Sequence, residues 1–73
     1  MNLLLARNRI LAYLVRNPGD RKVTDILTHL NASAYTDDRT LVNLSLRELE
    51  RHRLVLQTPV PGGGVYWRFR EEG

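Results

Sequence analysis

Arginine is the residue type in this chain with the most evident chemical use. Ten of the eleven basic residues are arginines, and Lys22 is the exception. Residues 39–70 hold six arginines and two glutamates, whereas residues 1–38 hold five basic and four acidic residues. Because a guanidinium binds phosphate oxygens and guanine edges through paired hydrogen bonds, this uneven charge favours a nucleic-acid partner. A solvated, arginine-rich surface without such a partner explains the same composition equally well.

Residue types that catalyse reactions or hold metals are sparse. The chain has no cysteine, and its two histidines, His29 and His52, do not form a His-x-x-x-His pair. Ser33 and Ser45 lack the glycine-flanked turn of a nucleophilic serine. The glycines at 62–64 lack the lysine and the following helix of a phosphate-binding loop. We therefore expect no enzyme, no metal site and no cofactor.

The length of 73 residues limits the chain to one small domain, residues 1–73. The hydrophobic content of 42% is typical of a folded domain. Arg7 and Arg9 interrupt the apolar start of the chain, which therefore predicts neither a membrane span nor a secretory signal. We expect a cytoplasmic protein with no membrane partner, and too small to enclose a pocket for a small-molecule effector.

Three stretches have the apolar spacing of amphipathic helices, at about 3–16, 24–30 and 37–53. An Asn-Pro-Gly-Asp turn ends the first stretch. Thr24 is a favourable N-cap for the second, and Asn31 suits the left-handed conformation that ends a helix. The chain between the second and third helices is expected to be a loop, with Tyr35 packing back on the core.

The first predicted helix is more apolar than one small core requires. One broad face carries Leu3, Leu4, Ile10, Leu11, Leu14 and Val15. Leu5 lies outside that face. Extra apolar surface of this kind predicts a homodimer contact through Leu3, Leu4 and Leu5. The alternative is that Leu5 is a single, tolerated exposed leucine.

The third predicted helix has one apolar and one polar face. Val42, Leu46 and Leu49 share the face that we expect to be buried. The opposite side presents Thr40, Leu44, Arg47 and Arg51, with Arg39 and Asn43 beside them. Arginine suits guanine, asparagine suits adenine, and threonine suits phosphate or a thymine methyl group. The outward face therefore has the right groups for contacts in the major groove of DNA.

Two strands are predicted at about 54–58 and 65–70, joined by a loop rich in glycine and proline. In the second strand, Val65, Trp67 and Phe69 alternate with Tyr66, Arg68 and Arg70. We expect the first set to face the helices. The second set would then face outward, where arginines can lie along a phosphate backbone.

The stretch at 42–55 resembles a motif of small prokaryotic and phage transcription regulators. It consists of Val42-Asn43-Leu44-Ser45-Leu46-Arg47-Glu48-Leu49-Glu50-Arg51-His52-Arg53-Leu54-Val55. Those proteins commonly read V-S-R-x-L-R-x-L-E-x-x-G-L-V before a wing. The order of elements over nearly the whole chain is also similar to the winged helix-turn-helix domain. This resemblance implies an α+β, mainly α fold, with three helices followed by a two-stranded β-hairpin wing. It also implies sequence-specific binding of double-stranded DNA.

The resemblance implies roles for particular side chains. Asn43, Leu44 and Arg47 match positions that face the groove, with Thr40 a turn earlier. Lys22 and Thr24 match a common phosphate contact. The remaining residues of the expected interface are Arg39 and Arg51, holding phosphates, and Arg68 and Arg70 on the second wing strand.

Several departures from the family pattern keep a second function open. Leu44 replaces a polar residue on the outward face, and the wing tip has no positive charge. Arg53 stands where the family has a helix-ending glycine, so we expect a different turn there. The segment at 31–41 is longer than the usual turn. A protein-protein interaction module within a larger complex is therefore the alternative function, and double-stranded RNA binding is a third.

Overall fold

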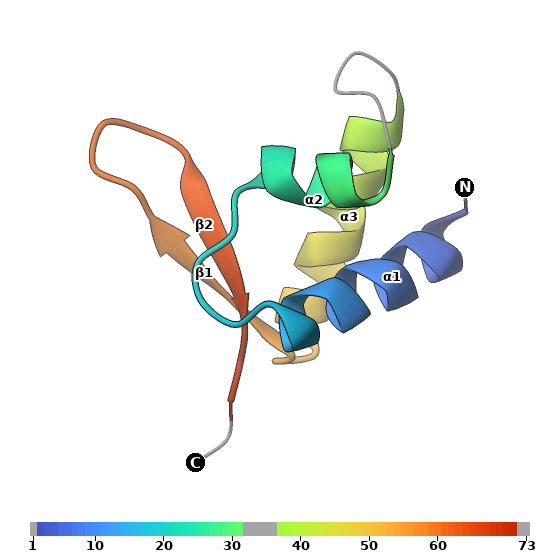
Figure 1. Cartoon of the computed structure of the whole chain (residues 1–73), viewed down its shortest axis with the longest axis horizontal. Coiled ribbons are helices and arrows are strands. Elements are labelled where there is room, and N and C mark those ends of the chain that lie inside the picture. The colour runs from blue at the N-terminus through green and yellow to red at the C-terminus, as the bar shows by residue number, and fades with distance from the viewer. Residues whose placement is uncertain (1, 32–36, 72–73) are drawn as a thin grey trace.

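The computed structural model describes residues 2–31 and 37–71 and has five elements (Figure 1). They are α1 (Leu3–Arg16), α2 (Val23–His29), α3 (Asp37–Arg51), β1 (Val55–Pro59) and β2 (Val65–Phe69). Three helices followed by an antiparallel hairpin confirm the predicted fold class, an α+β, mainly α, winged helix-like arrangement. The element ends differ from the predicted ones by no more than two residues, and α1 has the predicted ends. The expected packing of Tyr35 lies outside the described residues.

The ends of the first two helices are set by local hydrogen bonds. The Asn2 side chain accepts from the Leu5 amide at 2.8 Å and caps α1. Helix α2 begins at Val23 with Lys22 as its N-cap, so the predicted cap at Thr24 is wrong. The Asp25 carboxylate reaches back to the Lys22 amide at 3.0 Å, which starts the helix before Thr24. Asn31 has a φ of 55°, the left-handed conformation that was predicted.

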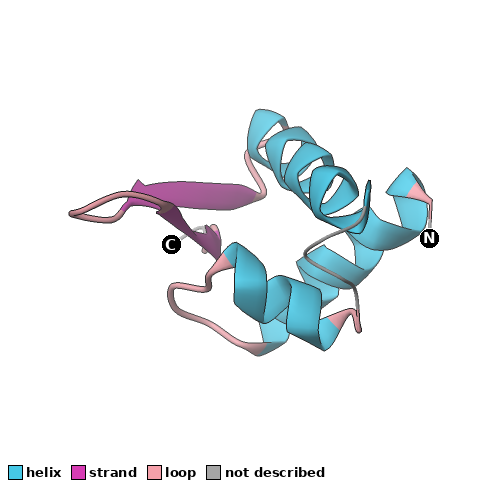
Figure 2. Ribbon diagram, turned by 90° about the horizontal axis from the view of Figure 1, so that it is seen from above, coloured by secondary structure: helices cyan, strands magenta, loops and turns pink. Residues whose placement is uncertain are grey.

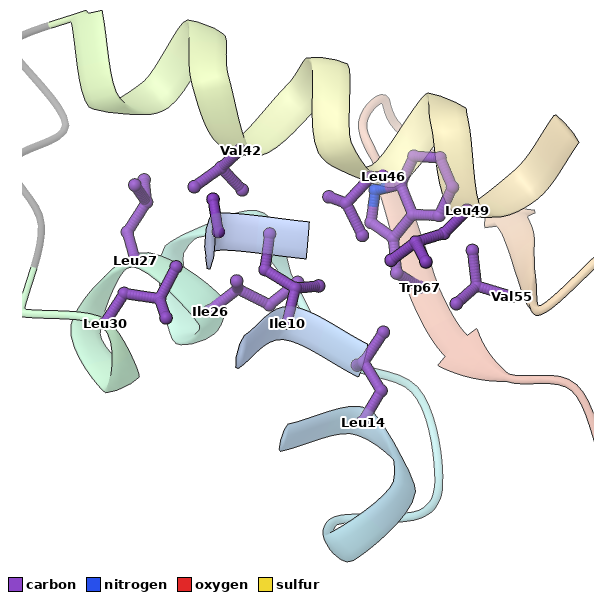
Figure 3. Packing of buried hydrophobic residues seen from close by; sticks show 11 residues of the cluster. Ile10, Leu14, Ile26, Leu27, Leu30, Val42, Leu46, Leu49, Val55 and Trp67 are labelled. Atoms are coloured by element: carbon purple, nitrogen blue, oxygen red, sulfur yellow. The ribbon is translucent and has the colours of Figure 1, made fainter. Parts of the chain in front are cut away.

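The core lies between the three helices and the hairpin (Figure 3). Its buried apolar side chains are Ala6, Ile10, Leu14, Ile26, Leu27, Leu30, Val42, Leu46, Leu49, Val55 and Trp67. Ser45 is also buried, and its hydroxyl donates to the Leu41 carbonyl at 2.8 Å. The predicted buried face of α3 is therefore confirmed. Burying each large apolar side chain contributes about 1.5–3 kcal/mol.

The buried face of α1 is narrower than predicted. Ile10 and Leu14 are buried together with Ala6, which lies one turn before them. Leu3, Leu4 and Val15 were expected on the core face, but all three are exposed. The reason is geometric. The apolar residues of α1 extend over two sides of the helix, but α2, α3 and the hairpin cover only one of these sides.

The hairpin is joined to the helices through a short backbone bridge. Strands β1 and β2 pair in register from Val55 opposite Phe69 to Pro59 opposite Val65. Arg21 then pairs with Trp67, with N–H to carbonyl distances of 2.8 and 2.7 Å. Figure 1 shows the segment between α1 and α2 passing beside β2. This bridge places the start of α2 next to the wing.

The turn after α3 is of the kind that a glycine would form. Arg53 has a φ of 61°, in the left-handed region. The Arg53 amide donates to the Glu50 carbonyl at 2.9 Å, and the Leu54 amide donates to the Leu49 carbonyl at 3.0 Å. The expectation of a different turn is therefore wrong, because Arg53 itself adopts the conformation at a cost of about 1–2 kcal/mol.

Candidate nucleic-acid interface

The outward face of α3 is open along the helix. Thr40, Leu44, Arg47 and Arg51 are exposed, whereas Asn43 is half-buried at the edge of the face. Because packing occupies the opposite side of α3, these side chains project from a rigid support. Leu44 keeps 53% of its surface exposed. The face therefore combines hydroxyl, guanidinium and apolar groups at spacings of three and four residues.

A hollow of about 450 Å³ lies between the start of α2, the first turns of α3 and the wing, and we call it the wing hollow. Four of the predicted site residues line it: Lys22, Thr24, Arg39 and Asn43. The rest of its lining is Val23, Val60, Gly63, Gly64, Val65 and Tyr66. Three segments that are distant in the sequence thus bring two cations, an amide and two hydroxyl groups together.

Two backbone features shape the wing hollow. The bridge between Arg21 and Trp67 brings their neighbours Lys22 and Tyr66 to the same side of the molecule. At the wing tip, Gly63 has a φ of 115°, and its amide donates to the Val60 carbonyl at 3.0 Å. A side chain is strained at that φ, so glycine allows the tight tip. Figure 2 shows the hairpin extending away from the helices.

The two predicted wing arginines do not join the wing hollow. Arg68 is exposed and lines a separate hollow of about 310 Å³ with Val15, Leu56 and Glu71. Arg70 is half-buried, just after β2, and its amide donates to the Leu54 carbonyl at 2.9 Å. The wing thus contributes two valines, two glycines and Tyr66 to the hollow, and neither of its arginines.

Arg51 differs from the other predicted cations of α3 because it is paired. Its guanidinium donates to the Glu48 carboxylate at 2.9 Å, and the His52 ring lies 3.1 Å from the same oxygen. The hydrogen bond from His52, assisted by the charge of Arg51, lowers the pKa of Glu48. Within residues 2–31 and 37–71, Arg39 and Arg47 form no ion pair. The unpaired positive charge therefore lies on the first three turns of α3.

Tyr66 was expected on the outward side of the second strand, on the same face as Arg68 and Arg70, but it was not included among the expected interface residues. The bridge that positions Lys22 was not predicted. The bridge between Arg21 and Trp67 had no signal in the sequence, because a single pair of residues produces no periodicity.

No protein-family model, curated protein or solved structure matches the chain. The winged helix-turn-helix family therefore stays a prediction. In the described part of the chain, no cluster of three or more metal-ligating side chains occurs. None of the helices there is both long and apolar enough to cross a membrane.

Proposed function

We propose that this protein binds double-stranded DNA as a small transcription regulator, with α3 in the major groove and the wing beside the phosphate backbone. The wing hollow is the observation that carries the proposal. Lys22 and Arg39 give it positive charge, and Thr24, Asn43 and Tyr66 add neutral hydrogen-bonding groups. This composition suits a phosphate group at the edge of the groove.

The dimensions and chemistry of α3 support the same proposal. Its 15 residues make a helix about 22 Å long, and the major groove is wide enough to admit a helix. Arg47 and Asn43 would then read base edges, while Thr40 and Arg39 hold phosphates. Arg51 is a weaker phosphate contact because Glu48 neutralises part of its charge.

A salt titration with random-sequence duplex DNA tests the proposal. Lys22, Arg39, Arg51 and Arg68 are the exposed cations that we expect to contact phosphates. Four phosphate contacts predict a slope of about −3 to −4 for the logarithm of the binding constant against the logarithm of the salt concentration. Lys22→Ala and Arg39→Ala should each make the slope shallower by about 1. Arg16→Ala, an exposed arginine of α1, is the matched control and should leave the slope unchanged.

Base reading is tested separately by selecting binding sites from a random pool. Arg47→Ala should relax discrimination at one base position by about 1–3 kcal/mol. Arg68→Ala should weaken binding to all sequences alike. Two variants with the same effect on selected and random sites would contradict this division of roles.

The exposed Leu44 supports a second candidate, a protein-protein interaction module. An apolar side chain with 53% exposure in the middle of the outward face suits an apolar partner surface. No DNA binding at about 50 mM salt would reject the DNA proposal and favour this candidate. Loss of a partner protein in Leu44→Ala with DNA affinity retained would also support it.

A further inference from the structure

A further hollow, of about 400 Å³, lies between α1 and the end of α2, and we call it the α1–α2 hollow. Its lining is Arg9, Ala12, Arg16, His29, Leu30 and Asn31. Leu30 is buried, and the polar side chains of the lining are exposed. None of the described residues that line the hollow is acidic. The α1–α2 hollow therefore gathers two guanidinium groups, an imidazole and an amide without a carboxylate.

The spacing of Arg9 and Arg16 along α1 brings both guanidinium groups to this hollow. Seven residues make almost two full turns, so the two side chains project within about 20° of each other and start about 10.5 Å apart along the helix. Ala12 lies between them, and its methyl group leaves the space above the helix open. Two long side chains can therefore converge on one ligand above Ala12.

His29 is held beside the two arginines by its stacking on Tyr13. The ring centroids are 4.4 Å apart, and the ring planes are inclined by 30°. Tyr13 lies four residues after Arg9 and three before Arg16, so it neighbours both of them on α1. The stack thus brings an imidazole N–H donor from α2 to the two donors from α1.

The basic groups of the α1–α2 hollow have no acidic partner in the described part of the chain. None of them takes part in an ion pair there, and α1 contains no acidic residue. Asp25 lies one turn before His29 on α2, but its carboxylate accepts from the Lys22 amide at 3.0 Å. The hollow therefore keeps a positive charge that an anion can neutralise.

We infer that the α1–α2 hollow binds the phosphate group of a small phosphorylated ligand. Three donors from two helices suit the three free oxygens of a phosphate monoester better than the two oxygens of a carboxylate. The volume of about 400 Å³ is also within the range of small-molecule sites. The sequence predicts no small-molecule effector because the chain is too small to enclose a pocket, but an open hollow between two helices needs no enclosure.

The α1–α2 hollow is separate from the expected DNA interface. It shares no lining residue with the wing hollow, because α2 contributes its start to the wing hollow and its end to this one. Helix α1 packs against the buried face of α3, opposite the outward face. A ligand bound here leaves the outward face of α3 uncovered, so the inference does not depend on DNA binding.

A titration with inorganic phosphate at constant ionic strength, followed by NMR of the backbone amides, tests the inference. The amides of Ala12 and Asn31 should shift together, with a Kd on the order of 1 mM. Arg9→Ala and Arg16→Ala should each raise this Kd by at least about tenfold, because each removes a charge-assisted hydrogen bond. Arg7→Ala is the matched control, since Arg7 lies on α1 but projects about 160° away from Arg9, and it should leave the Kd unchanged.

Several results would overturn the inference. The first is the absence of shifts up to about 50 mM phosphate, and the second is an Arg7→Ala variant as weak as Arg9→Ala. Acetate that binds as tightly as phosphate would reject the phosphate assignment. AMP should bind at least as tightly as a phosphoserine peptide, and a peptide that binds more than about tenfold tighter would indicate a phosphorylated protein instead. A shallower salt slope for DNA in Arg9→Ala would place a DNA phosphate in the hollow. Circular dichroism confirms that each variant is folded.

Discussion

Replacing Arg53 by glycine should stabilise this protein. Arg53 is exposed, has a φ of 61° and makes no side-chain hydrogen bond to a described residue. Its left-handed conformation costs about 1–2 kcal/mol, a strain that glycine does not have. Glycine also makes the unfolded chain more flexible, which costs about 0.5–1 kcal/mol. The difference predicts that Arg53→Gly raises the free energy of unfolding by about 0.5–1 kcal/mol.

Thermal unfolding measured by circular dichroism suits this prediction. In a domain of this size, 1 kcal/mol shifts the Tm by about 4–8 °C, so Arg53→Gly should raise the Tm by roughly 2–8 °C. Arg47→Gly is the matched control, because Arg47 is exposed in the interior of α3. There glycine should lower the free energy of unfolding by about 1 kcal/mol. A lower Tm in both variants would refute the argument that Arg53 is strained.

Two further predictions concern α3. Leu46→Ala should lower the free energy of unfolding by about 3 kcal/mol, because Leu46 is fully buried. The exposed Leu44→Ala should change it by less than about 0.5 kcal/mol, and equal effects in urea unfolding would contradict the assignment of the two faces. The His52 hydrogen bond and the Arg51 charge hold the pKa of Glu48 below its ordinary value of 4.5. These two interactions therefore stabilise the fold at pH values above 4.5. Their contribution is lost as the pH falls through the lowered pKa of Glu48, because the carboxylate is then protonated. In an NMR titration, His52→Ala should raise the pKa of Glu48 toward 4.5, and an unchanged pKa would exclude this cause.

The features that were predictable from the sequence depend on residues close together in the chain. The buried face of α3 follows from the spacing of Val42, Leu46 and Leu49, since a helix returns to the same side every three to four residues. In the hairpin, the alternation that places Trp67 inward and Arg68 outward follows from the two-residue repeat of a strand. Both patterns were confirmed because local geometry produces them, whatever packs on the outside.

Which apolar residues of α1 become buried was decided by the tertiary structure. Periodicity predicts one broad face, but only contact with α2, α3 and the hairpin determines that Ala6 is covered and Val15 is not. The turn at Arg53 shows a second limit, because the packing of Leu49 and Val55 on either side holds an arginine in the conformation of a glycine. Local propensity alone argues against that conformation.

The sequence by itself determined the order of the elements, the polar side of α3 and the concentration of arginine in the second half of the chain. Only the tertiary structure brought Lys22, Asn43 and Tyr66 around one hollow and left Arg68 outside it. The physical reason is that the bridge between Arg21 and Trp67 joins residues 46 positions apart through two backbone hydrogen bonds. Every residue except proline can form such bonds, so no side-chain pattern records where they occur.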